Sequence, residues 1–286
     1  MFEFTGVSAS RNGTFGEHNE DVATFIEGGA WVIDGATGLT DHTYTSASTD
    51  GQWFAQTFDE LLRDRIDRNE ALSNIVSDSI KDIREKYYSI AGSDDIDKVT
   101  EPSGAIAIVR PHPETELEFF VLGDCSVVAS HPNRTTTDIL GKGPREYDKK
   151  AIKNLSELVH EGYSHKEAFE EIKPMLREHR RLKNTPDGYW GLGFSTEAVD
   201  HARTGKFKWG DVRFLSLFTD GFEQIIQVFD VFCDWSAALN YIETNGVERS
   251  LRVLRDIQRS DPNCRRYPRL KPSDDMSLVA VGEQTN

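Results

Sequence analysis

Five short acidic segments, spread along the whole chain, contain the residues best suited to chemistry. They are Asn19-Glu20-Asp21, Asp34-Gly35, Gly123-Asp124, Asp220-Gly221 and Asp274-Asp275. Four of them stand where an apolar run begins or ends, so a sheet could bring their carboxylates to one edge. Converging carboxylates repel one another unless protons or cations neutralise them, and hard divalent cations prefer oxygen ligands. The pattern therefore predicts a carboxylate-bridged site for two metal ions.

The elements that must position these segments follow from the periodicity of the apolar residues. Strands are expected over residues 2–10, 22–27, 30–34, 105–110, 117–130, 213–218 and 275–281. Gly28-Gly29 suits the turn of a hairpin between the second and third of them. Helices are expected over residues 46–66, 71–90, 151–160, 165–182, 235–243 and 248–259. Thr49 or Asp50 can cap the first helix, and Pro174 predicts a kink or break in the fourth.

Strands dominate both ends of the chain, and helices come in pairs between them. This order differs from the strict alternation of a doubly wound parallel sheet. It fits an α+β fold in which helix pairs flank two antiparallel sheets. No Pro/Gly/Ser-rich linker divides the 286 residues, so we expect one domain.

The amino-acid composition disfavours several classes of binding partner. The formal charge of −15 disfavours binding to nucleic acid and to anionic membranes, and it also repels phosphate-bearing substrates unless local cations overcome that field. The three cysteines, Cys125, Cys233 and Cys264, form neither a zinc pattern nor a disulfide framework. We therefore expect reduced thiols and a cytoplasmic protein, without a signal peptide or a membrane helix.

Six segments, in order, resemble the metal-dependent protein phosphatase family (PPM, type 2C). They are Asn19-Glu20-Asp21, Val32-Ile33-Asp34-Gly35, Ser103-Gly104-Ala105-Ile106-Ala107, Gly123-Asp124-Cys125, Leu217-Phe218-Thr219-Asp220-Gly221 and Asp274-Asp275-Met276-Ser277. Each segment alone is common, since Asp-Gly is a frequent turn dipeptide. The resemblance covers nearly the whole chain. It implies one phosphatase domain over residues 1–286, a four-layer α-β-β-α sandwich, and a helical flap-like insertion around residues 131–208.

The resemblance also implies a role for each acidic residue. Asp34 would bridge two Mg²⁺ or Mn²⁺ ions, the Gly35 carbonyl would be a further ligand, and Asp220 and Asp274 would complete the catalytic core. Asp21 would contact a metal or its waters, with Glu20 behind it. Asp124 matches a residue linked to a third, weaker metal in some members of the family.

Plainer interpretations of the same residues stay open. Asp34 and Asp124 could only form turns, and Asp220 could only cap a helix. Asp274 could cap a turn beside Pro272, or exchange its role with Asp275.

The chain departs from the family pattern where the substrate would be held. Gly16 stands where the family has a phosphate-gripping Arg, Ala36 replaces a His, and Gln224 replaces an Asp. The candidate replacements for the missing guanidinium group are Arg11, Arg180 and Arg181. Arg180 and Arg181 could instead belong to a solvated helix face.

Three functions are consistent with these observations. The leading one is hydrolysis of phosphoserine or phosphothreonine in proteins by a metal-activated water, with no phosphoenzyme. The second is the same chemistry on a small phosphorylated metabolite, which the missing Arg favours. The third is a pseudophosphatase, which would bind a partner without turnover. The acidic residues of the core argue against this third function. The sequence leaves the oligomeric state open.

Overall fold

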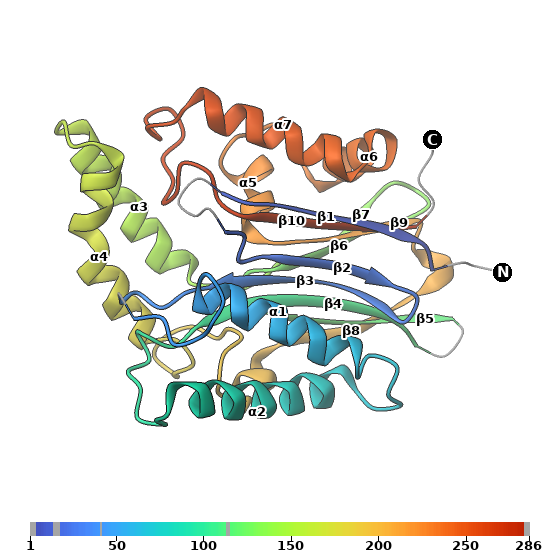
Figure 1. The fold of residues 1–286 in the computed structure, drawn as a ribbon. Helices are drawn as coiled ribbons and strands as arrows, with labels where there is room; N and C mark the ends of the chain where they lie inside the picture. Colours follow the sequence, from blue (N-terminus) through green and yellow to red (C-terminus); the bar gives the residue numbers. More distant parts are fainter. Residues whose placement is uncertain (1–3, 14–17, 41, 113–114, 283–286) are drawn as a thin grey trace.

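Two five-stranded antiparallel sheets, stacked face to face, form the centre of the computed structural model, which describes residues 4–13, 18–40, 42–112 and 115–282 (Figure 1). The first sheet has the order β1(Gly6–Arg11), β10(Met276–Val281), β9(Phe214–Phe218), β6(Ser126–Ser130) and β7(Thr136–Ile139). The second sheet has the order β2(Val22–Ile26), β3(Gly29–Ala36), β4(Ser103–His112), β5(Glu116–Leu122) and β8(Arg203–Lys208). The predicted pair of antiparallel sheets is confirmed.

Helices cover the outer face of each sheet. The second sheet carries α1(Asp50–Arg63) and α2(Leu72–Ala91), and the first carries α5(Asp220–Gln227), α6(Trp235–Asn245) and α7(Val247–Ser260). The four layers therefore follow the order α-β-β-α, as predicted (Figure 1). None of the helices among the described residues combines the length and the apolar character that crossing a bilayer requires.

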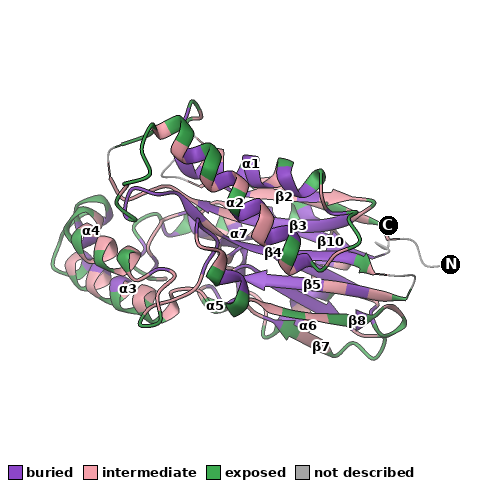
Figure 2. Ribbon diagram, turned by 90° about the horizontal axis from the view of Figure 1, so that it is seen from below, coloured by how far each residue is buried: buried purple, intermediate pink, exposed green. Residues whose placement is uncertain are grey.

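The side chains of β3 contribute to two apolar clusters, one on each face of the second sheet. Trp31 and Ile33 join the apolar cluster beneath α1 and α2, whereas Ala30 and Val32 lie in the cluster between the two sheets. Successive side chains of a strand point to opposite faces, so a strand buried on both faces needs an unbroken apolar run. Figure 2 shows that the inner strands β3, β4 and β10 are buried along most of their length, while the edge strand β8 and the helices keep exposed faces.

Several boundaries differ from the predictions: the helix expected from residue 151 begins at Arg145, and two other differences have a clear physical reason. The strand expected over residues 117–130 is divided, because the chain leaves the second sheet after β5 and enters the first at β6, with Gly123 at φ 84° between them. The first helix begins at Asp50 instead of residue 46, because the Asp50 carboxylate accepts hydrogen bonds from the N–H groups of Tyr44 and Thr45 and holds that segment as a loop. Thr49 caps this helix by accepting from the Gln52 N–H at 3.0 Å.

The helices α3(Arg145–His160) and α4(His165–Arg181) form an antiparallel pair at one end of the sandwich (Figure 1). They bury an apolar cluster of their own, formed by Ala151, Leu155, Val159, Ala168 and Ile172. A capping box between Ser164 and Glu167 starts α4. Of the kink or break predicted at Pro174, the break is wrong, because α4 continues through this residue. The 3₁₀ turns η1(Thr196–His201) and η2(Trp209–Asp211) flank β8. The flap-like insertion around residues 131–208 remains our proposal for the domain organisation.

Candidate metal centre

The predicted acidic residues converge at one end of the two sheets. Asp34 lies near the end of β3, and Asp21 stands just before β2, the antiparallel neighbour of β3. Asp220 follows β9 and Asp274 shortly precedes β10, again an antiparallel pair, and Asp124 lies between β5 and β6. An antiparallel neighbour begins where its partner strand ends, which puts each set at one edge. The Asp21 Oδ2 atom accepts a hydrogen bond from Thr219 Oγ1 at 2.8 Å and so joins the two edges.

Burial and mutual repulsion disfavour the charged forms of the carboxyl groups in this acidic cluster. Burial, followed by repulsion from Asp21 and Asp220, raises the pKa of Asp34 well above its usual value. Burial and repulsion from Asp274 raise the pKa of Asp220 to about 7. Burial is also the main cause that raises the pKa of Asp124 to about 6. Cations bound among these carboxyl groups would therefore favour their charged forms.

The chemistry of this donor set fits Mg²⁺ or Mn²⁺. The cluster offers carboxylate oxygens and no thiolate or imidazole, since Cys125 is buried and burial raises the pKa of its thiol well above the usual value. Within the part of the chain that the structure describes, no three His, Cys, Asp or Glu side chains already stand in a metal-binding arrangement. The fit therefore rests on the oxygen donors and their mutual repulsion.

Close packing around the cluster requires a glycine in both Asp-Gly pairs, Asp34-Gly35 and Asp220-Gly221. A Cβ atom at Gly221 would lie 1.8 Å from the Asp275 carbonyl oxygen, and one at Gly35 would lie 2.4 Å from the Glu20 carbonyl oxygen. Both contacts are shorter than real Cβ atoms allow, so no larger residue fits without backbone movement. Gly35 also donates its N–H to the Glu20 carbonyl at 3.2 Å, which ties the Asp21 segment to the end of β3.

The structure separates the roles of Asp274 and Asp275, which the sequence left interchangeable. The Asp275 carboxylate accepts from the N–H of Gly13 at 2.5 Å and from that of Glu20 at 2.9 Å, so it anchors the N-terminal segment. Asp274 lines a cleft and pairs with Lys271, with Nζ 2.5 Å from Oδ1. Glu20 accepts hydrogen bonds from the N–H and the hydroxyl of Thr37, just beyond β3.

The cleft has a volume of about 670 Å³ and contains residues that the motifs did not reveal. Asp124, Asp220 and Asp274 line it together with Arg145, Asp148, Glu223 and Lys271. Arg145 pairs with Glu223, with nitrogen–oxygen distances of 2.9 and 3.1 Å. Burial, followed by repulsion from Asp220 and Asp274, raises the pKa of Asp148 to about 7. No local pattern marks Asp148, because only the packing of α3 brings its first turn to the cluster.

The three arginines predicted to grip phosphate do not line this cleft. Arg11 pairs with Glu248 on α7. Arg180 donates to Ser103 Oγ at 2.7 Å and to the Thr37 carbonyl at 3.4 Å, and Arg181 pairs with Glu178 and Asp97. Gly16, the position of the missing family Arg, lies outside the described residues.

Comparisons with known proteins agree with this architecture. The family model described as protein phosphatase 2C matches residues 5–255, which confirms the resemblance seen in the sequence. No curated protein matches the chain. The serine/threonine phosphatase PstP/Ppp of Mycobacterium tuberculosis has a similar solved structure, with a TM-score of 0.58, 13% identity and 99% of each chain covered.

Two further solved structures show the same fold. The serine/threonine phosphatase Stp1 of Staphylococcus aureus gives a TM-score of 0.56 at 10% identity, covering 100% of this chain and 96% of that one. The catalytic domain of a serine/threonine protein phosphatase PstP, in complex with two manganese ions, gives 0.55 at 14% identity, covering 98% and 99%. At these identities the likeness concerns the fold alone.

Proposed function

The chain belongs to the protein phosphatase 2C family, and from this premise we propose that it hydrolyses phosphoserine and phosphothreonine in proteins with divalent cations bound at the acidic cluster. The observation that supports this proposal most is the convergence of Asp21, Asp34, Asp124, Asp220 and Asp274 at one end of the two sheets.

The proposed ligands follow from position and burial. Asp34 lies on β3, whose neighbouring residues are buried on both faces, and would hold two Mg²⁺ or Mn²⁺ ions together with Asp220 and Asp274. The Gly35 carbonyl and Asp21 would complete this site, and Asp124 would hold a third ion. When bound, such cations neutralise the phosphate and lower the pKa of a coordinated water.

We propose that Lys271 supplies the cation that the family Arg would supply. Burial lowers the pKa of Lys271, but Asp274, Asp34 and Asp220 outweigh burial and raise that pKa well above its usual value. The ammonium group is therefore charged inside the cleft, where it can donate to a phosphate oxygen. Arg145 also lines the cleft and pairs with Glu223, as Lys271 pairs with Asp274, but Glu223 is not one of the proposed metal ligands.

Lys271→Met is expected to raise KM and lower kcat, by about 10- to 1,000-fold in kcat/KM, because a donor to the phosphate is lost. Lys153→Met is the matched control. Lys153 is exposed on α3, and its Nζ atom lies 3.9 Å from the Glu157 carboxylate, farther than Lys271 lies from Asp274. Steady-state kinetics of both variants, and of Arg11→Ala, Arg180→Ala and Arg181→Ala, show which cationic side chain binds the phosphate group. Parent-like kinetics of Lys271→Met would contradict the proposed role.

The second candidate is the same reaction on a small phosphorylated metabolite. The cleft of about 670 Å³, bordered by α3 and by the loop that carries Lys271, has a size suited to such a molecule. A turnover profile across phosphopeptides and phosphorylated metabolites separates the two substrates. We expect the highest kcat/KM for phosphoserine or phosphothreonine peptides. A metabolite that is hydrolysed at least ~10-fold better than every peptide would reverse this assignment.

A further inference from the structure

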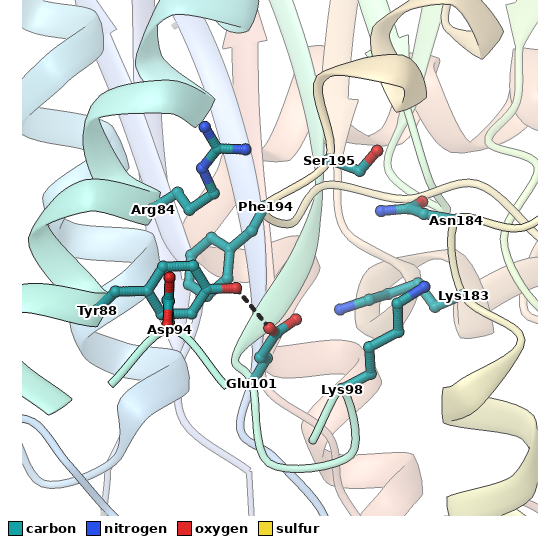
Figure 3. Close-up of a pocket in the computed structure, with 9 residues that line it drawn as sticks. All are labelled: Arg84, Tyr88, Asp94, Lys98, Glu101, Lys183, Asn184, Phe194 and Ser195. Carbon is teal, nitrogen blue, oxygen red and sulfur yellow. Dashed lines mark hydrogen bonds between the residues drawn. The ribbon is translucent and has the colours of Figure 1, made fainter. Parts of the chain in front are cut away.

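A second pocket, of about 470 Å³, lies between α2, the loop that precedes β4, and the segment that follows α4. None of the residues that line this pocket lines the acidic cleft. Figure 3 shows Lys98, Lys183, Asn184 and Ser195 on one side of the pocket and Arg84, Tyr88 and Asp94 on the other, with Glu101 between them. The pocket belongs to no motif that was identified in the sequence.

Lys183 is the unusual member of this pocket. Its side chain is 5% exposed, yet its Nζ atom has no hydrogen-bond partner among the described residues. A buried ammonium group without a partner is costly, and proteins normally pair or hydrogen-bond such a charge. The Lys183 N–H donates to the Arg180 carbonyl at 3.1 Å, so the backbone at this position is fixed. Lys183 therefore presents a donor that the protein itself does not satisfy.

The neighbouring side chains add further donors. Asn184 accepts a hydrogen bond from the Gly191 N–H through Oδ1 at 2.9 Å, which leaves its NH₂ group available to the pocket. Arg84 and Lys98 line the pocket, and neither forms an ion pair with any residue that the structure describes. Glu101 Oε1 already accepts from the Tyr88 hydroxyl at 2.7 Å. Unsatisfied donors therefore outnumber free acceptors.

The segment that carries these donors is held in place before any ligand arrives. Asn184 donates its N–H to the Tyr189 carbonyl at 2.7 Å, and Leu192 exchanges two backbone hydrogen bonds with Gly104 on β4, at 2.8 and 2.9 Å. Phe194 packs against Tyr88, with ring centroids 5.5 Å apart. A preorganised set of donors loses little entropy when a ligand binds.

We propose that this pocket binds a small organic anion, whose carboxylate or phosphate oxygens accept hydrogen bonds from Lys183 and Asn184. Lys98, on the side of Lys183, and Arg84, on the side of Tyr88, supply the remaining positive charge. The volume of about 470 Å³ suits a metabolite and excludes a folded partner.

The protonation of Lys183 agrees with this assignment. Burial, reinforced by Arg180 and Lys98 and opposed by Glu101, lowers the pKa of Lys183 well below its usual value. Arg84 and Asp94 are the other charged groups that line the pocket. An anion beside the amine favours its charged form, so anion binding is expected to raise the pKa of Lys183 and to be accompanied by proton uptake.

The test uses the full chain without metal, and the Lys183→Met variant separates binding in this pocket from binding in the cleft. Calorimetric titrations with inorganic phosphate and, separately, with succinate show which oxyanion the pocket prefers. We expect saturable binding of at least one of them, and about 10- to 100-fold weaker binding to Lys183→Met. Titration in two buffers of different ionisation enthalpy should show proton uptake by the parent that the variant lacks. Lys81→Met is the matched control, since Lys81 is exposed on α2 and pairs with Asp78.

Thermal melts of the anion-free proteins separate binding from folding. Lys183→Met should melt at the parent's temperature or higher, because an unpartnered buried amine is removed. Failure of both anions to bind the parent would overturn the proposal. Equal affinity in Lys183→Met, or a clear loss of its stability without anion, would overturn it as well.

Discussion

Asp34→Asn is expected to lower phosphomonoester turnover by ~1,000-fold or more, because the carboxylate proposed to bridge the two metal ions loses its charge and its second anionic oxygen. Asp220→Asn should act in the same way. Both substitutions keep the size of the side chain, so the fold should persist. Asp138→Asn is the matched control, since Asp138 is exposed on β7. Steady-state kinetics with a generic aryl phosphate and saturating Mn²⁺ measure the effect, and parent-like turnover of Asp34→Asn would contradict the assignment.

The stability of the same variant without metal gives an independent readout. The pKa of Asp34 is raised in the folded protein, so this residue costs no stability below its unfolded pKa and costs progressively more as pH rises through its folded pKa. Asp34→Asn should therefore melt at a higher temperature than the metal-free parent at pH 8, and the difference should shrink towards pH 4. A lower melting temperature at pH 8 would show that Asp34 stabilises the fold by contacts of its own.

Removal of divalent cations is expected to abolish turnover altogether, with restoration by Mn²⁺ or Mg²⁺. The described part of the cleft offers carboxylates and five cationic side chains, but no cysteine or serine nucleophile lines it. The control is the same chelator saturated with a cation beforehand, which separates metal loss from inhibition by the chelator. Undiminished turnover after complete metal removal would contradict the proposed chemistry. No turnover under any metal condition would instead favour a pseudophosphatase.

The sequence was sufficient for the parts of the fold that depend on local patterns. The apolar run into Asp34 predicted β3, and the stripe that contains Phe54 and Phe58 predicted α1. The ordered acidic segments predicted which carboxylates converge, because each adjoins a strand and antiparallel pairing carries strand ends to one edge.

The sequence was insufficient where only tertiary packing brings groups together. Lys271 pairs with Asp274, three residues further along the same loop. Asp148 lines the cleft because α3 packs beside the acidic cluster. Lys183 is covered by the segment that pairs with β4. None of these residues belongs to a motif with a fixed spacing. The strand β8, which reads RTGKFK and is mostly polar, also escaped prediction, because it lies at the edge of its sheet and buries little.

Anomalous diffraction at the manganese absorption edge, from crystals of the protein prepared with Mn²⁺, tests the central claim most directly. We predict manganese peaks in the space enclosed by Asp34, Asp220 and Asp274, with Asp34 touching more than one ion. Crystals that contain Mn²⁺ elsewhere, or none between these three carboxylates, would contradict the proposal that the acidic cluster is a metal centre.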